Sequence, residues 1–285
     1  MPQAGRKSNK PHVVIVGGGF GGLSAVRALA RSPLRVTLID KRNYHLFRPL
    51  LYQVAAGLLS GDEVASPLRS VLSNQGNTDV LMAEVTGVDV KSCVVQMNGA
   101  ELAYDYLILA LGIRDNYFGH DDWEKFAPGL QALDDADVIR GKILTAFEEA
   151  ERLAALGDAP PEEIQSLLTF VLVGGGTVGV EMASTIAELA RMSLPRDFRH
   201  ISADKARIIL FEGQPCILPA YPKALSNKAQ NHLQSLGVEV RTGTHVESVD
   251  ARGVTAGGKR VESHTILWSA GVRPSPAGQW LGAET

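Results

Sequence analysis

The chain has 285 residues, of which 45% are hydrophobic and 21% charged, and its 28 basic and 31 acidic residues give a net charge of −3. This length predicts about two domains, with ample apolar material for their cores. The balanced charge argues against a nucleic-acid-binding protein and against a polybasic membrane-binding protein, because both need a large positive field. Glycine is enriched, with 29 residues. It follows no collagen-like period, so we expect the excess in local loops.

The chain opens with the pattern of a strand, a tight turn, a helix and a second strand. An apolar run at 12–16 (HVVIV) is followed by the turn GGGFGG, an Ala- and Leu-rich stretch at 23–32 and an apolar run at 35–40. Strands that are apolar throughout are typical of a parallel sheet with both faces buried. Residues 43–72 mix helical and loop signals. Strand-like runs follow at 80–90, 92–97 and 104–112, with turns at Asn98–Gly99 and Gly112.

The same pattern returns in the second half of the chain. A helix is predicted over 132–156, and the segment GDAPPEE at 157–163 predicts a domain boundary. An apolar run at 167–173, the turn GGGTVGVE, a helix at 182–192 and a strand at 207–212 then repeat the opening unit. A helix at 223–236 and short strands within 238–268 complete the second domain. The repetition predicts an α/β fold with two Rossmann-like dinucleotide-binding domains.

Each glycine-rich turn fits the pattern G-x-G-x-x-G. The first glycine makes the sharp turn from strand to helix, the second lets a pyrophosphate approach the backbone, and the third allows close packing of helix on strand. The anion then lies on free N–H groups at the positive end of the helix. The three positions are Gly17, Gly19 and Gly22 in the first copy and Gly174, Gly176 and Gly179 in the second. A purely structural turn is the alternative.

An acid ends the second strand of each copy, Asp40 in the first and Glu212 in the second. A carboxylate at this position can accept hydrogen bonds from both ribose hydroxyls of a dinucleotide. It also repels a 2′-phosphate, so Glu212 favours NADH over NADPH. The alternative for each is a solvated acid at the end of a strand.

Two dinucleotide folds in one chain suit a flavin dinucleotide and a nicotinamide dinucleotide, between which hydride passes. No metal site is predicted: the histidines form no HxH or HExxH pattern, and Cys93 and Cys216 form no CxxC pair. Residues 1–10 are polar without the apolar core of a signal peptide, and no run of 18 apolar residues appears. We therefore expect a cytoplasmic location.

Several segments resemble a known family. VIVGGGFGGLSAVRAL, VTLIDKRNYHLFRPLLYQVAAGLLS, YFGHDDWEKFAPGL and LTFVLVGGGTVGVEMASTIAELAR are similar to type II NADH:quinone oxidoreductases, which are two-dinucleotide-binding flavoproteins. The resemblance runs from about residue 11 to the last residue. It implies FAD and NADH as cofactors, a quinone as acceptor, action at the cytoplasmic face of the membrane and a homodimeric state.

The resemblance also implies a division of the chain. A polar tail at 1–10 precedes the first part of the FAD-binding domain at 11–160, the NADH-binding domain is inserted at 161–273, and 274–285 begin the return to the FAD domain. In the family this return completes the flavin site and carries the quinone site and an amphipathic membrane anchor. We expect those parts to be missing from this chain.

Site residues carry over by position. The resemblance implies that the first glycine set and Asp40 hold FAD, and that the second set and Glu212 hold NADH. Further FAD contacts are implied for Lys41 and Arg42 near the adenine end, for the backbone of Val85 at the adenine, and for Ala110 and Gly112. Glu181 is implied as the catalytic residue near the nicotinamide and the flavin, and Ala270 and Gly271 as a loop beside the nicotinamide.

Purely structural roles are the alternatives for several of these positions. Lys41 and Arg42 could be a solvated basic pair, and Ala270 and Gly271 could have only a core or turn role. Glu181 could be a first-turn acid that stabilises the helix dipole.

The chain departs from the family pattern in the glycine turns and beside them. Leu111 stands where the family has threonine in Ala-Thr-Gly, so a branched apolar group replaces a small hydroxyl at that flavin contact. Thr177 and Val178 replace Pro-Thr in the second turn, where phosphate binding should survive.

The sequence is therefore compatible with three functions. The first is an FAD-dependent NADH dehydrogenase that reduces a quinone. The second is a truncated NADH-binding module without retained flavin, and the third is a soluble flavin reductase that passes electrons to a protein or to oxygen.

Overall fold

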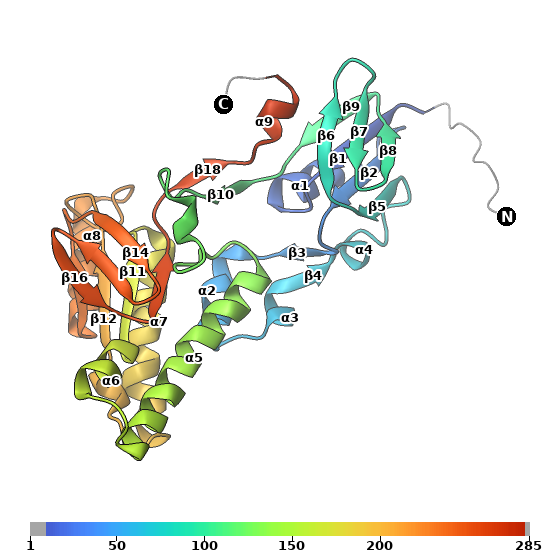
Figure 1. Ribbon diagram of the computed structural model, residues 1–285. Helices are drawn as coiled ribbons and strands as arrows, with labels where there is room; N and C mark the ends of the chain where they lie inside the picture. The colour runs from blue at the N-terminus through green and yellow to red at the C-terminus, as the bar shows by residue number, and fades with distance from the viewer. Residues whose placement is uncertain (1–9, 283–285) are drawn as a thin grey trace. The chain divides into compact units, whose positions relative to one another are not determined.

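The computed structural model describes residues 10–282, which form two compact units. Unit 1 takes its described residues from 10–47, 62–114 and 273–282, and unit 2 comprises Arg48–Gly61 and Asp115–Val272. Both units are therefore discontinuous. Each contains a four-stranded parallel sheet, which confirms the predicted fold class. Figure 1 shows the elements of both units, most of them labelled.

The centre of unit 1 is a four-stranded parallel sheet in the order β5-β2-β1-β9. Its strands are β1 (His12–Val16), β2 (Arg35–Asp40), β5 (Thr78–Met82) and β9 (Tyr106–Leu109). Successive side chains of β1 face opposite sides. Ile15 packs toward helix α1 (Phe20–Ala28), and Val16 packs toward an antiparallel sheet of β6 (Val85–Asp89), β7 (Val94–Met97) and β8 (Ala100–Ala103). Both faces are covered, so β1 is apolar from Val13 to Val16.

The apolar run at 80–90 is not one strand. It is divided between β5 and β6, which belong to different sheets. The chain turns at Ala83, whose backbone N–H donates to the carbonyl oxygen of Asp40 at 2.9 Å. Leu81 and Met82 before this turn are apolar although they are exposed, so hydrophobicity alone could not locate the break.

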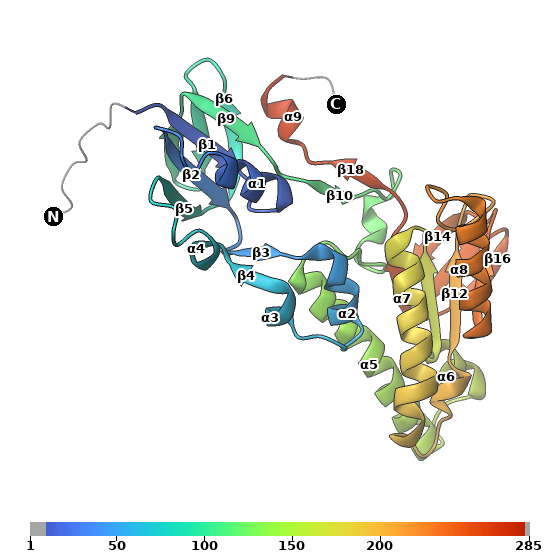
Figure 2. The ribbon, with the colours of Figure 1, turned by 180° about the vertical axis from the view of Figure 1, so that it is seen from behind.

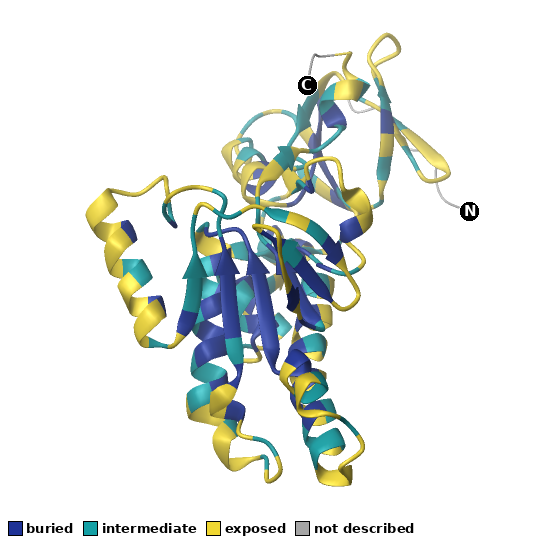
Figure 3. Cartoon of the chain, turned by 60° about the vertical axis from the view of Figure 1, so that its left-hand side comes forward, coloured by how far each residue is buried: buried dark blue, intermediate teal, exposed yellow. Residues whose placement is uncertain are grey.

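The centre of unit 2 repeats the sheet of unit 1. Its strands are β11 (Thr169–Val173), β12 (Arg207–Phe211), β13 (Val238–Arg241) and β17 (Thr265–Trp268), all parallel in the order β13-β12-β11-β17. An antiparallel sheet of β14 (Val246–Asp250), β15 (Gly253–Ala256) and β16 (Lys259–Glu262) again precedes the last strand. Buried positions, dark blue in Figure 3, gather on the parallel strands. In both units the strand order is third, second, first and last.

Helices cover the sheet of unit 2. They are α5 (Leu133–Leu156), α6 (Pro161–Leu167), α7 (Thr177–Glu188) and α8 (Lys223–Ser235). The predicted helix at 132–156 is confirmed as α5, and the one at 223–236 as α8. The helix predicted at 182–192 begins earlier, at Thr177, and continues after Glu188 as a π-helical turn, Leu189–Ser193.

The structure draws the domain division elsewhere than at residue 160. The segment 157–163 lies inside unit 2, where it forms the loop after α5 and the first residues of α6. The physical reason is a contact across the sheet: Phe147 of α5 stacks on Phe170 of β11 with ring centroids 5.2 Å apart, and both side chains are fully buried. This packing places α5 in unit 2, so the division falls at Arg114 and Asp115.

Residues 48–61 also belong to unit 2 rather than to the first domain. Helix α2 (Leu51–Ala55) contacts α5 and α7 (Figure 2), and its Leu51, Val54 and Ala55 are buried. The last two crossings between the units fall in β10 (Ile113–Asp115) and β18 (Val272–Pro274), which pair with each other.

The remaining elements are short. They are β3 (Tyr44–Leu46), which pairs with β4 (Ala65–Pro67), the helices α3 (Gly61–Val64), α4 (Leu68–Val71) and α9 (Ala277–Trp280), and the 3₁₀ turns Arg48–Leu50, Asp121–Trp123, Leu194–Arg196 and Ala203–Lys205. Between residues 10 and 282, no helix is both long enough and apolar enough to cross a membrane.

Candidate functional site

The two glycine turns have nearly the same backbone geometry. The N–H of Gly17 donates to the carbonyl oxygen of Ile39 at 2.8 Å, and the N–H of Gly174 donates to that of Phe211 at 2.8 Å. Gly17 has φ +108° and Gly174 has φ +109°, in the region that favours glycine. Each turn is thus hydrogen-bonded to the end of the neighbouring strand, at the carboxyl edge of the sheet. Parallel α/β folds bind their ligands at this edge.

The third glycine of each turn is required by packing. A Cβ on Gly22 would lie 1.7 Å from the carbonyl oxygen of Gly17, and one on Gly179 would lie 1.9 Å from that of Gly174. Both contacts are with backbone that cannot move aside. The predicted role of these glycines, close approach of helix to strand, agrees with this geometry.

The second glycine of each turn faces open space. A Cβ on Gly19 or on Gly176 would meet no atom within 4 Å. These residues are the N-caps of α1 and α7, neither end has a side-chain cap, and neither helix has an acid in its first turn. Packing therefore does not demand glycine here. A bare backbone with uncapped N–H groups at a helix N-terminus fits a phosphate group.

The two strand-end acids bind the glycine turns in the same way. Asp40 accepts hydrogen bonds from the N–H of Gly18 at 2.5 Å and of Arg42 at 2.7 Å. Glu212 accepts them from the N–H of Gly175 at 2.6 Å and of Gln214 at 2.7 Å. Each carboxylate is thus ordered at the turn, with lone pairs left to accept the ribose hydroxyls predicted for it.

The carbonyl of the middle glycine is also engaged in each turn, but by different groups. In unit 1 the Nδ1–H of His45 donates to the carbonyl oxygen of Gly18 at 2.9 Å. In unit 2 the backbone N–H of Leu218 donates to that of Gly175 at 2.7 Å. Sequence reasoning missed both partners. His45 lies five residues after Asp40, and Leu218 lies six residues after Glu212. A comparison of the two copies of the motif could have suggested these partners from this similar spacing.

The other positions implied for FAD lie around the first turn. Ala110 follows β9, and its N–H donates to the carbonyl oxygen of Val16 at 2.8 Å. A Cβ on Gly17 would lie 2.3 Å from the carbonyl oxygen of Ala110. Gly112 has φ +70°. Lys41 is exposed and Val85, half-buried, begins β6. Arg42 is held through its backbone bond to Asp40.

Ala270 and Gly271 follow β17 as Leu111 and Gly112 follow β9. Gly271 has φ +72°, close to that of Gly112, and a Cβ on it would lie 2.6 Å from the ring of Phe118. The N–H of Asn116 donates to the carbonyl oxygen of Gly271 at 3.3 Å. These contacts show a turn role for Gly271. Before it, the hydroxyl of Ser269 donates to the carbonyl of Gly174, with an Oγ–O distance of 2.9 Å.

Glu181 lies in the second turn of α7, not in the first. The helix-dipole effect falls off within the first turn, so that alternative loses its basis. Glu181 lines a groove with Tyr52 of α2, Ser184 and Glu188 of α7, and His232 of α8. Burial raises the pKa of the Glu181 carboxyl, which makes it a better proton carrier near neutral pH.

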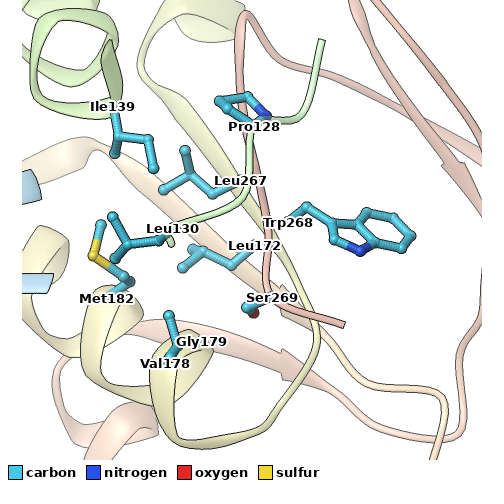
Figure 4. Close-up of a pocket in the computed structure, with 10 residues that line it drawn as sticks. All are labelled: Pro128, Leu130, Ile139, Leu172, Val178, Gly179, Met182, Leu267, Trp268 and Ser269. Carbon is cyan, nitrogen blue, oxygen red and sulfur yellow. The ribbon is translucent and has the colours of Figure 1, made fainter. Parts of the chain in front are cut away.

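A small apolar hollow lies on the other side of α7 (Figure 4). The side chains of Leu130, Ile139, Leu172 and Met182 converge on it, while the Trp268 ring turns away. Gly179 also lines it. Apart from Ser269 its lining is apolar, so it packs α7 against the sheet and offers a polar ligand no partners.

Within residues 10–282, no three His, Cys, Asp or Glu side chains are grouped so that they could hold a metal ion. Cys93 is exposed in unit 1 and Cys216 is half-buried in unit 2.

The sequence profile described as pyridine nucleotide-disulphide oxidoreductase matches residues 11–285. The chain belongs to this family. The resemblance seen in the sequence is confirmed as well. The chain is 45% identical over 282 residues to type II NADH:quinone oxidoreductase Ndh of Mycobacterium tuberculosis and 42% identical over 278 residues to NdhA of the same organism.

The fold agrees with a solved relative. The chain matches the structure of NDH2 from Plasmodium falciparum in complex with NADH with a TM-score of 0.88 and 27% identity. That match covers 95% of this chain and 57% of the other. The matches to Ndh and NdhA cover 96% and 94% of this chain but 60% and 58% of those proteins. The chain thus spans about 60% of the length of these relatives.

Proposed function

We propose that the protein is an FAD-dependent oxidoreductase that takes a hydride from NADH and passes two electrons to a quinone. Unit 1 holds FAD and unit 2 holds NADH. The observation that carries this proposal is the pair of matching turns, each with an uncapped helix N-terminus, an open second glycine and an ordered acid. The names of the similar M. tuberculosis proteins support the same activity.

The FAD site is assigned to residues of unit 1. Gly17, Gly19 and Gly22 would hold the pyrophosphate at the N-terminus of α1, and Asp40 the ribose. Lys41, Arg42 and Val85 would line the adenine end, and Ala110 and Gly112 would approach the flavin. The open space at Gly19 and the ordered Asp40 carboxylate fit such a group. When bound, FAD supplies the ring that accepts the hydride and returns the electrons to the acceptor.

The NADH site is assigned to residues of unit 2. Gly174, Gly176 and Gly179 shape the pyrophosphate site, Glu212 accepts the ribose hydroxyls, and Ala270 and Gly271 lie toward the nicotinamide. A 2′-phosphate would add two negative charges beside the Glu212 carboxylate, so this residue selects NADH over NADPH.

Glu181 is assigned the catalytic role. Reduction of a quinone by NADH takes up one further proton from the medium, since NADH, H⁺ and quinone give NAD⁺ and quinol. We propose that the Glu181 carboxyl delivers this proton. Its raised pKa keeps it protonated to higher pH than a solvated glutamate, and the polar groove that it lines provides a route for reprotonation.

Action at the cytoplasmic face of a membrane and a homodimeric state are carried over from the family resemblance as further proposals. A lipid-soluble quinone acceptor requires access to a bilayer. Co-sedimentation with liposomes and light scattering test the two proposals separately.

The purified 285-residue chain provides the main test. A yellow protein that bleaches under anaerobic NADH, and that a soluble quinone analogue reoxidises faster than oxygen does, supports the proposal. Reoxidation by oxygen at the same rate with and without quinone would instead identify a flavin reductase.

A nicotinamide-binding module without flavin is the second candidate. Unit 2 by itself contains a complete turn, the acid Glu212 and a continuous core. A colourless protein that binds NADH and shows no activity with added FAD would establish this function and exclude the first.

A further inference from the structure

The duplication of the fold allows residues of one unit to be matched to those of the other beyond the glycine turns. After β5 the N–H of Ala83 donates to the carbonyl oxygen of Asp40 at 2.9 Å. After β13 the N–H of Thr244 donates to that of Glu212 at 3.0 Å. The next strand begins two residues later in both units, at Val85 and at Val246.

The two strands that follow share a further irregularity. The pairing of β6 with β7 shifts register between Val85 and Gly87, and that of β14 with β15 shifts between Val246 and Ser248. Such a bulge re-aims the side chains next to it. Segments 83–85 and 244–246 are therefore equivalent, and in unit 2 the middle residue of this segment is His245.

The His245 ring lies directly over Gly213, the residue after the ribose acid. A Cβ on Gly213 would fall 2.5 Å from Cε1 and 2.7 Å from Nδ1 of this ring. His245 is nevertheless exposed as a residue, so the imidazole contacts the backbone of Gly213 and still presents surface to solvent. A neighbouring hydrogen bond, from the N–H of Gly243 to the carbonyl oxygen of Gln214 at 2.8 Å, joins the two loops.

An adenine is attached to the ribose whose hydroxyls an acid in this position binds. The base must therefore lie about the width of one sugar ring away from Glu212, next to the segments that flank this residue. We infer that His245 forms the aromatic wall of the adenine subsite in unit 2, and that Gly213 is glycine so that the imidazole can lie flat against the chain. This inference rests on the proposed NADH site.

Stacking of a base on an aromatic ring contributes measurably to affinity and tolerates exchange of one aromatic residue for another. The ring of His245 already lies beside Gly213, on the side of the loop where the adenine is inferred to bind. The residue should affect ligands that carry the adenosine half of NADH and leave the nicotinamide half alone.

Binding of AMP, NADH and reduced nicotinamide mononucleotide to the full chain tests the inference. His245→Ala should weaken AMP and NADH binding about tenfold and leave reduced nicotinamide mononucleotide unchanged. His245→Phe should bind AMP nearly as the wild type does. Gly213→Ala displaces the ring without removing it and should also weaken AMP binding. His120→Ala, which removes another exposed histidine of unit 2 that stacks on an aromatic residue, Trp123, is the control.

The outcomes separate the two proposals. If the wild type binds NADH and His245→Ala binds AMP as tightly, or loses affinity for both halves of NADH equally, the inference about His245 is wrong while the proposed function stands. If the wild type binds neither AMP nor NADH, the proposed NADH site itself is wrong. Thermal unfolding of each variant shows whether a loss of binding reflects a loss of fold.

Discussion

The Glu212 carboxylate and the backbone N–H of Gly175 form a hydrogen bond of 2.6 Å that joins the end of one strand to the turn after its neighbour. Asp40 and Gly18 form the equivalent bond in unit 1. A charged acceptor forms stronger hydrogen bonds than a neutral one. Each acid therefore orders its turn and still has lone pairs that can accept hydrogen bonds from ribose hydroxyls. Substitution of either acid should therefore affect one nucleotide and not the other.

Glu212→Gln tests this separation. The amide keeps the size of the side chain but loses its charge, so NADH affinity should fall about ten- to a hundredfold, in line with the 1.5–3 kcal/mol of a hydrogen bond to a charged group. Discrimination against NADPH should shrink, because the repulsion of the 2′-phosphate is gone. Fluorescence titration with both nucleotides measures the two effects. Asp40→Asn is the matched control and should reduce retained FAD while leaving NADH affinity intact. An equal loss of NADH affinity in both variants would contradict the assignment.

Gly176 and Gly179 should respond differently to alanine. A methyl group on Gly179 would lie 1.9 Å from the carbonyl oxygen of Gly174, so Gly179→Ala should lower the free energy of unfolding by about 2 kcal/mol or more. Gly176→Ala meets open space and should change stability by less than about 0.5 kcal/mol, yet weaken NADH binding because the methyl group occupies the place of the phosphate. Chemical denaturation and NADH titration test the pair. Stable, tight-binding Gly176→Ala would show that the phosphate does not lie there.

Glu181→Gln should lower quinone reduction about a hundredfold, the usual effect of losing a proton donor. The bleaching of flavin by NADH should be much less affected, because hydride transfer needs no added proton. Stopped-flow measurement of the two half-reactions across pH distinguishes them. In the wild type the quinone half-reaction should slow as pH rises through the pKa of Glu181, and this limb should be absent from the variant. Equal slowing of both half-reactions would argue for a structural role.

The same glutamate predicts a dependence of stability on pH. Burial raises the pKa of Glu181 above its ordinary value of 4.5. Its contribution to stability is therefore fully present below pH 4.5 and is lost as pH rises through the folded-state pKa. Glu181→Gln should be more stable than the wild type at pH 7 and equal to it near pH 4. The reverse order in denaturant titrations would show that the charged carboxylate is stabilised.

His12 should make unit 1 sensitive to acid. Its ring is buried, with Nε2 at 2.8 Å from the hydroxyl of Thr37 and Nδ1 at 2.7 Å from the guanidinium of Arg35. Burial, and then the charge of Arg35, hold its pKa below the ordinary 6.5, against the opposing effects of the hydrogen bond to the Ala103 carbonyl oxygen and of Asp105 and Asp79. The neutral ring is thus favoured by folding, and stability present above pH 6.5 is lost as pH falls through the folded-state pKa.

Replacement of this histidine should flatten that dependence. His12→Gln removes the titrating group, so its melting temperature should change less between pH 7.5 and 5 than that of the wild type, whatever its absolute stability. His120→Gln, at an exposed position, should retain the wild-type slope. Identical slopes in His12→Gln and the wild type would assign the acid sensitivity to other groups.

Much of this protein could be predicted from sequence because its repeated βαβ motif is local. A strand, a glycine turn, a helix and a strand with a terminal acid lie within about 30 residues. The third glycine of each motif is required by a contact inside the motif, such as that of Gly22 with Gly17. The chain therefore determined by itself the two units, their parallel sheets, the positions of both turns and the roles open to Asp40 and Glu212.

Only the tertiary structure decided which segments each unit contains. Phe147 joins α5 to unit 2 by stacking on Phe170, and a turn at Ala83 sends one apolar run into two sheets. His45 reaches the carbonyl of Gly18, and His245 lies over Gly213. These contacts link residues that are 23 to 43 positions apart in the sequence. They depend on how the sheets are packed, which hydrophobic period and local turn chemistry do not encode.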